Sequence, residues 1–153
     1  MAEIIFDLMQ DWHLPAVFEL EQTLFSGEEW SQEQFESEMD LVPESRRYWV
    51  AKLEGVVVGY FGLILIDDFA DVATIAVVPE IRRQGVASKM IELMLAEARR
   101  RGMKRMLLEV RTTNDAAIAL YKRFGFEIIA ERPNYYGPDL SAFLMERQGL
   151  DSE

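Results

Sequence analysis

Hydrophobic and polar residues alternate in some stretches of the chain, and hydrophobic residues recur every three or four positions in others. Alternating or β-branched stretches predict seven strands, at residues 3–9, 48–53, 55–67, 71–78, 105–110, 126–133 and 141–147. Helical spacing predicts four helices, at residues 11–25, 30–39, 85–101 and 114–125. The predicted order along the chain is therefore β-α-α-β-β-β-α-β-α-β-β.

Local signals mark several ends of these elements. Ser31 with Gln34 three positions later is typical of a capping box, and Asn114 is suited to an N-cap. Glu54-Gly55 and Asp67-Asp68 fall where hairpin turns are needed. With no repeat and no low-complexity linker, the pattern predicts one α+β domain over residues 1–153, with helices on both faces of a mixed sheet.

Length and composition agree with this prediction and restrict the location. A chain of 153 residues is long enough to bury one sizeable core. Half of the residues are apolar, yet no apolar run approaches the roughly 18 residues that span a bilayer. The first residues also lack the basic and apolar segments of a secretory leader. We therefore expect a soluble, cytoplasmic protein that does not associate with membranes.

The scarcity of certain side chains narrows the chemistry. The chain has no cysteine, which excludes disulfides, thiolate metal sites and a cysteine acyl-enzyme. His13 is the one imidazole, so we expect no metal centre. The formal net charge of −11 argues against direct nucleic-acid binding and suits a basic partner.

The stretch RRQGVA, residues 82–87, lies between a predicted strand and a predicted helix. A glycine at a helix start lets the backbone approach a ligand, while free N–H groups and the helix dipole favour an anion. Arg82 and Arg83 add positive charge that suits phosphate oxygens. Taken alone, the hexapeptide is better explained as the start of a surface helix.

Two longer segments decide between these interpretations. The loop matches the R/Q-x-x-G-x-G/A pattern, and residues 114–126 match N-x-x-A-x-x-L-Y-x-x-x-G-F. Together with the order of elements, they make the chain similar to the GNAT N-acetyltransferases, whose cofactor-binding core corresponds to about residues 72–126. The segments IAV, LLEVR, FSGEEWS and NYY most resemble the bacterial ribosomal-protein alanine N-acetyltransferases of the RimI type. This resemblance implies a seven-stranded, mostly antiparallel GNAT sheet.

The resemblance also implies a set of residues that bind acetyl-CoA as co-substrate. Ile75, Ala76 and Val77 would offer strand backbone to the pantetheine arm, and Asn114 would contact the cofactor beyond the thioester. The residues implied for the pyrophosphate follow one another in the loop and the helix start: Arg82, Arg83, Gln84, Gly85, Val86, Ala87 and Ser88.

Glu109 is the implied general base. Strand alternation places it on the face opposite Met106, Leu108 and Val110, where a carboxylate is unusual for a covered sheet. The residues alone leave two interpretations open: a functional carboxylate, or a strand end that has reached water or Arg111. In the resembled enzymes, the glutamate of this LEV segment removes a proton from the acceptor amine.

Tyr121 is the implied general acid for the leaving thiolate, although its helical spacing alone is that of a core aromatic. The Val77 amide would bind the thioester oxygen. Trp30 and Tyr135 are implied substrate contacts, but Trp30 equally suits a staple for the helix at 30–39, and Tyr135 equally suits a cap on the sheet. We interpret the early acidic residues, including Glu21, as a solvated face that a basic tail would approach.

The predicted function is transfer of acetyl from acetyl-CoA to the α-amine of a protein N-terminus, with a ribosomal-protein alanine as the leading acceptor. An α-amine titrates near pH 8 and a lysine more than two units higher, so one glutamate suits the α-amine better. Two alternatives stay open: a GNAT enzyme for lysine, polyamine or another small amine, and an acyl-CoA sensor without turnover. The sequence leaves the oligomeric state open between a monomer and a weak dimer.

Overall fold

The computed structural model describes residues 3–152. Its strands are β1 (Ile4–Leu8), β2 (Arg46–Leu53), β3 (Val56–Ile66), β4 (Phe69–Val77), β5 (Arg105–Arg111), β6 (Glu127–Gly137) and β7 (Leu140–Arg147). Its α-helices are α1 (Leu14–Leu24), α2 (Gln32–Met39), α3 (Val86–Arg100) and α4 (Asp115–Arg123). Three short 3-10 helices are η1 (Asp11–His13), η2 (Pro79–Ile81) and η3 (Leu150–Ser152).

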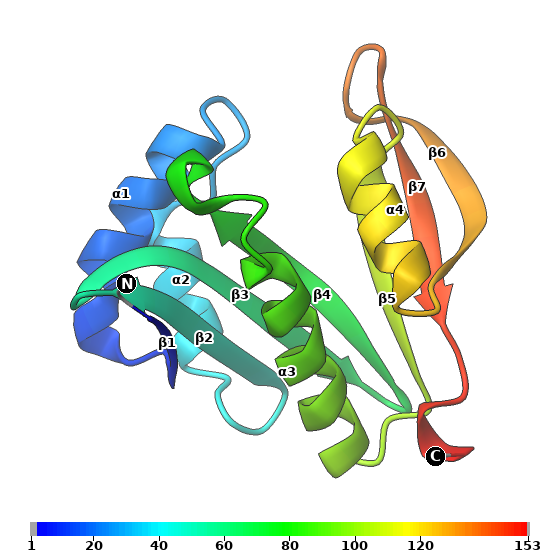
Figure 1. The fold of residues 1–153 in the computed structure, drawn as a ribbon, viewed down its shortest axis with the longest axis horizontal. Coiled ribbons are helices and arrows are strands. Elements are labelled where there is room, and N and C mark those ends of the chain that lie inside the picture. Colours follow the sequence, from blue (N-terminus) through cyan, green and yellow to red (C-terminus); the bar gives the residue numbers. More distant parts are fainter. Residues whose placement is uncertain (1–2, 153) are drawn as a thin grey trace. The chain divides into compact units, whose positions relative to one another are not determined.

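The strands form one sheet in the order β1-β2-β3-β4-β5-β7-β6 (Figure 1). β4 runs parallel to β5, whereas β1–β2, β2–β3, β5–β7 and β6–β7 are antiparallel pairs. The predicted fold class, a mixed and mostly antiparallel seven-stranded sheet with four helices, is confirmed.

The start of α2 follows from its local sequence. The Ser31 hydroxyl accepts a hydrogen bond from the Gln34 amide at 3.1 Å, and the Gln34 side-chain oxygen accepts one from the Ser31 amide at 2.8 Å. This is the predicted capping box. The Trp30 ring, just before the cap, lies 5.1 Å from the Phe35 ring, which makes it a hydrophobic staple as well.

The turn between β2 and β3 also has a local cause. Glu54 and Gly55 both adopt left-handed backbone conformations, with φ of 50° and 83°. This is the conformation of a two-residue type I′ hairpin, and glycine adopts it without steric cost. The predicted hairpin turn is confirmed.

The chain divides into two compact units: residues up to Ile64 with Ala73–Met90, and Leu65–Val72 with the residues from Ile91 onward. In the first unit, α1 and α2 contribute Val17 and Phe35 to a core on the face of β2 and β3 that carries Val50 and Tyr60. On the opposite face, a Cβ added at Gly59 would meet the Met90 side chain of α3 at 3.0 Å.

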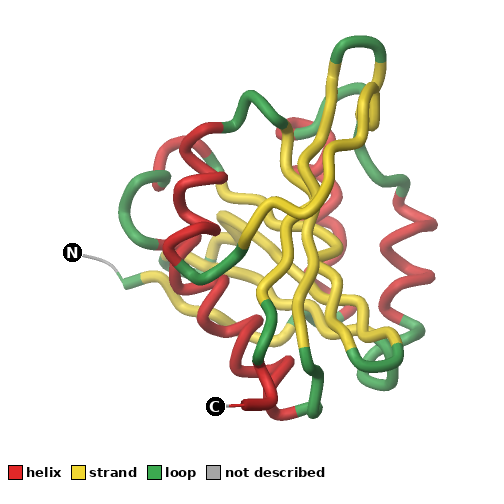
Figure 2. The backbone as a smooth tube through the Cα atoms, turned by 90° about the vertical axis from the view of Figure 1, so that its right-hand side faces the viewer, coloured by secondary structure: helices red, strands yellow, loops and turns green. Residues whose placement is uncertain are grey.

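In the second unit, β5 buries one face and keeps the other partly exposed. Met106, Leu108 and Val110 are buried, while Leu107 and Glu109 are partly exposed. The predicted alternation along this strand is therefore confirmed. The tip of the β6–β7 hairpin extends beyond the N-terminal end of α4 (Figures 1 and 2).

Two expectations were wrong. The predicted strand at residues 126–133 continues through Tyr135 and Tyr136 to Gly137 in β6, because β6 is the last strand of the sheet, where Pro133 can lack an N–H donor without loss. Glu21 is not on a solvated face: it is only 3% exposed, since it points from α1 toward buried polar partners.

Candidate active site

The end of β4 is fixed within the first unit. Ala76 and Val77 are buried, and the Val78 amide donates to the Val58 carbonyl of β3 at 2.9 Å. The chain then turns through η2, and Arg82 Nε donates back to the Val77 carbonyl at 3.1 Å. Arg82 thus ties the loop to the strand end, and part of its guanidinium stays exposed for a ligand.

The loop from Arg82 to Gly85 leads directly into α3. Gly85 has a φ of 80°, and a Cβ built there meets no atom within 4 Å. Arg83 also adopts a left-handed φ, 66°, which an L side chain rarely favours. The first α3 hydrogen bond runs from the Lys89 amide to the Gly85 carbonyl, so the preceding N–H groups have no acceptor within the helix.

This geometry suits an anionic group. Exposed arginines, an open glycine and the unpaired N–H groups of a fifteen-residue helix lie in one continuous segment. The structure therefore brings together the residues predicted for the pyrophosphate, 82–88, and their chemistry fits it.

A second set of functional groups lies in the second unit. Asp71 of β4, Glu109 of β5, and Arg132 and Tyr135 of β6 interact electrostatically, and we call these four residues the carboxyl cluster. Arg132 Nη1 lies 3.8 Å from Glu109 Oε1, and the Arg132 guanidinium lies 5.5 Å from the centre of the Tyr135 ring. Burial, and secondarily the charge of Glu109, raise the pKa of Asp71 to about 6. Burial and the same charge also raise the pKa of Tyr135.

The partner of Glu109 differs from the one considered in the sequence. Glu109, whose side chain is 19% exposed, is paired with Arg132, whereas the Arg111 guanidinium lies over the Tyr136 ring at 5.2 Å. Sequence analysis did not find Asp71 or Arg132. The available signal for Asp71 was a carboxylate at the start of a predicted strand, which does not by itself distinguish it from a turn residue.

Helix α4 positions Asn114 and Tyr121. Asn114 Oδ1 accepts from the Ala117 amide at 3.2 Å, which confirms its N-cap role and leaves its NH₂ group to donate. Tyr121 is only 7% exposed, with its ring 5.9 Å from Phe126. Burial, and then Tyr136, raise the pKa of Tyr121 to about 12, so its hydroxyl stays protonated at neutral pH.

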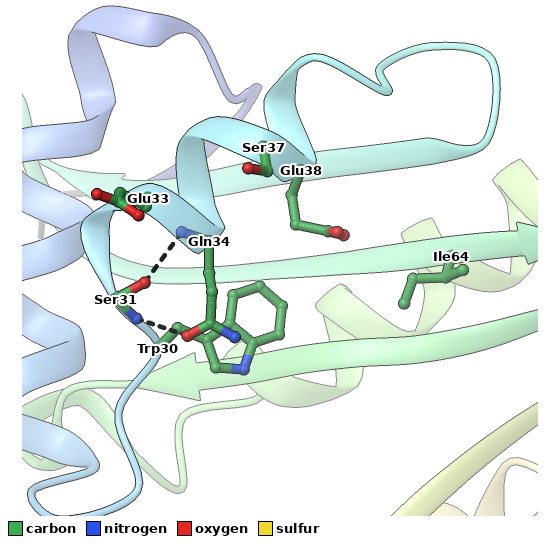
Figure 3. Close-up of a pocket in the computed structure, with 7 residues that line it drawn as sticks. All are labelled: Trp30, Ser31, Glu33, Gln34, Ser37, Glu38 and Ile64. Carbon is green, nitrogen blue, oxygen red and sulfur yellow. Dashed lines mark hydrogen bonds between the residues drawn. The ribbon is translucent and has the colours of Figure 1, made fainter.

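Trp30 lines a pocket of about 340 Å³ in the first unit (Figure 3). The other lining residues come from the N-cap of α2, from α2 itself and from β3: Ser31, Glu33, Gln34, Ser37, Glu38 and Ile64. Glu38 is also paired with Arg46 at 2.5 Å and accepts from the Tyr48 hydroxyl at 2.7 Å. Trp30 is thus both the staple of α2 and a wall of an acidic pocket.

Buried hydrogen bonds hold Trp30 in place. Glu21 accepts from the Tyr60 hydroxyl at 2.5 Å and from the Trp30 amide at 2.8 Å. Burial raises the pKa of Glu21, while both hydrogen bonds oppose that change. We call these three residues the Glu21 network.

Two further observations concern the whole described part of the chain. Residues 3–152 contain no group of three or more histidine, cysteine, aspartate or glutamate residues arranged to hold a metal ion. None of the helices over the same residues has both the length and the apolar character needed to cross a membrane.

Comparison with known proteins decides the family. The model of the acetyltransferase (GNAT) family matches residues 8–126. The chain belongs to the GNAT family. Its members use acetyl-CoA as co-substrate, and this chain is an acetyl-CoA-dependent N-acetyltransferase of that family.

Two relatives of this GNAT enzyme and one similar solved structure are informative. The [ribosomal protein bS18]-alanine N-acetyltransferase of Escherichia coli is 34% identical over 125 residues, 80% of each chain. The N-alpha-acetyltransferase RimI of Mycobacterium tuberculosis is 36% identical over 141 residues, 87% of this chain and 85% of the relative. The crystal structure of the Escherichia coli ribosomal-protein-S18-alanine enzyme superposes with a TM-score of 0.85 at 29% identity, covering 95% of this chain and 94% of the other.

Proposed function

We propose that this enzyme acetylates the α-amino group of a protein N-terminus, with the N-terminal alanine of a small-subunit ribosomal protein as its leading acceptor. The observation that carries the proposal is the identity of 32–34%, over about four fifths of the chain, to relatives named for the alanine of ribosomal protein bS18. The pocket beside Trp30 supports a basic acceptor, because Glu33 in its lining complements positive charge.

The proposed binding of acetyl-CoA uses mainly backbone groups. Ile75, Ala76 and Val77 would pair with the pantetheine arm, and the segment Arg82–Ser88 would hold the pyrophosphate, mainly through its N–H groups. Their support is the open Gly85 and the free first turn of α3. The Asn114 NH₂ group would contact the cofactor beyond the thioester.

Glu109 is the proposed general base. It would take a proton from the acceptor ammonium group, through water, so that the nitrogen lone pair can attack the thioester carbon. The partial burial of its side chain, which is 19% exposed, supports this role. The cluster around it also holds a second carboxyl group, Asp71.

Attack forms the N–C bond and places negative charge on the thioester oxygen, which the Val77 amide would stabilise. The C–S bond then breaks, and the Tyr121 hydroxyl would give its proton to the departing sulfur. A phenol that stays protonated at neutral pH is suited to that donation. Trp30 and Tyr135 would contact the acceptor peptide.

The test uses a basic peptide that begins with Ala-Arg, beside the same peptide with its N-terminus blocked. Purified protein and acetyl-CoA are mixed with each peptide, and thiol release and peptide mass are followed. Because the chain has no cysteine, every new thiol comes from CoA. We expect acetylation of the free peptide alone.

Other outcomes would contradict the proposal in distinct ways. Acetylation of both peptides would identify lysine as the acceptor. Acetylation of neither, with acetyl-CoA still bound, would point to a small amine such as a polyamine.

A further inference from the structure

Asp71 occupies a defined place beside the proposed base. The parallel register of β4 with β5 pairs Phe69 with Arg105, Ala70 with Met106 and Asp71 with Leu107. Residues paired in register point to the same face of a sheet, and so do residues two apart on one strand. Asp71 and Glu109 therefore lie on one face, as diagonal neighbours across β4 and β5.

The two carboxyl groups differ in their partners. The Arg132 guanidinium is paired with Glu109, whereas among residues 3–152 no side chain or amide donates a hydrogen bond to the Asp71 carboxyl group. Asp71 is partly buried, and its charged neighbours are Glu109 on β5 and Arg132 on β6, with the Tyr135 hydroxyl also near. A shielded carboxyl group with no donor gains from taking up a proton.

We propose that Asp71 and Glu109 act as one proton-accepting pair, in which Asp71 is the positioning residue that shares the proton taken by Glu109 from the acceptor ammonium group. This proposal rests on the proposed function. The proton leaves the ammonium nitrogen, reaches Glu109 and is held between the two carboxyl groups. The freed lone pair forms the N–C bond as the C–S bond breaks, and the pair returns its proton to solvent afterwards.

The pair improves the match between base and acceptor. An α-ammonium group has a pKa near 8, and an isolated glutamate has one near 4.3. Burial and the charge of Glu109 raise the pKa of Asp71 to about 6, which narrows the gap that the proton must cross. With a Brønsted dependence of about one half, closing the gap by two pKa units raises the rate about tenfold.

The experiment is the pH dependence of kcat/KM with the Ala-Arg peptide, from pH 5 to 9, for the wild type and Asp71→Asn. We expect an acidic limb near pH 6 in the wild type. In Asp71→Asn the limb should move to lower pH, and kcat should fall about tenfold at pH 7.5 because the remaining base is weaker. The KM for acetyl-CoA should stay within about twofold, since Asp71 acts on the proton and not on cofactor binding.

Matched variants separate this role from a structural one. Asp68→Asn removes an exposed carboxylate from the same β3–β4 hairpin and should leave the profile unchanged. Asp71→Glu keeps a carboxyl group, so its acidic limb should lie at higher pH than that of Asp71→Asn. This variant also serves as the test if Asp71→Asn folds poorly.

The outcomes also separate the pair from the proposed function. An acidic limb at the same pH in the wild type and Asp71→Asn, with Glu109→Gln inactive, would overturn the pair and leave Glu109 as a lone base. Wild-type activity in Glu109→Gln would instead overturn the base assignment itself, and the pair with it.

Discussion

The Glu21 network and the carboxyl cluster each bury a carboxyl group, but they satisfy it differently. Glu21 is almost fully buried and accepts two hydrogen bonds, from Tyr60 and Trp30. Asp71 is less buried, yet among the described residues it accepts none, and its surroundings are charged. A buried acceptor with its donors in place stabilises structure, whereas one without donors is free to exchange a proton.

The largest effect should come from Glu109→Gln. If the carboxyl cluster serves chemistry, this variant loses the proposed base, and kcat falls about 100-fold or more. Its melting temperature should stay within about 2 °C, because the side chain keeps its shape and is not fully buried. The measurements are steady-state turnover and thermal unfolding, with Glu131→Gln on exposed β6 as control. If Glu109→Gln kept half of the wild-type activity, the carboxyl cluster would not serve catalysis, and it would no longer differ in role from the Glu21 network.

Glu21→Ala should lower stability and leave turnover nearly unchanged, the opposite of Glu109→Gln. It leaves the Tyr60 hydroxyl and the Trp30 amide without their acceptor, which costs about 2–4 kcal/mol of unfolding free energy. Turnover of folded protein at saturating peptide should change by less than about threefold, since no proposed proton transfer involves Glu21. Urea unfolding measures the unfolding free energy, and Glu19→Ala, at an exposed position on the same helix, is the control. Equal stabilities of the two variants would show that the network is not structural.

Arg132→Gln removes the positive charge from the carboxyl cluster. Arg132 lowers the pKa of Asp71, so its removal should move the acidic limb of kcat/KM to higher pH, opposite to Asp71→Asn. The ratio of activity at pH 6 to that at pH 8 should fall about threefold. In an Asp71→Asn background the same change should move the limb less, because Arg132 then acts on Glu109 alone. A shift of the same size there would show that Asp71 does not contribute to the limb.

The smallest effect concerns the pH dependence of stability. Burial raises the pKa of Glu21 in the folded state. The stability that protonated Glu21 contributes is therefore complete below the pKa of the unfolded state, and it is lost as the pH rises through the pKa of the folded state. The unfolding free energy of the wild type, relative to that of Glu21→Gln, should therefore fall between pH 4 and pH 8. The fall should be smaller than the about 2–4 kcal/mol lost in Glu21→Ala. Unfolding free energies at both pH values check this. A constant difference would mean that Glu21 stays in one protonation state.

Signals within a few residues predicted much of the fold. The cap at Ser31, the staple of Trp30 and the Glu54-Gly55 turn each depend on neighbours in sequence. The loop at residues 82–88 was likewise predictable, because strand, glycine and helix follow one another.

Long-range contacts account for what the sequence did not predict. The burial of Glu21 depends on Tyr60, which lies 39 residues later. The place of Asp71 depends on the register of β4 with β5, and that of Arg132 on β6 pairing at the sheet edge. These features arise when distant strands pair, so periodicity along the chain cannot reveal them.

The position of Trp30 gives the enzyme a built-in optical probe. The chain has three tryptophans. Trp12 is 75% exposed and Trp49 is buried and stacked on Phe61, so their fluorescence has little reason to respond to a peptide in the acidic pocket. Trp30 lines that pocket, and a change in its emission on adding peptide without acetyl-CoA would test the proposed contact with the acceptor.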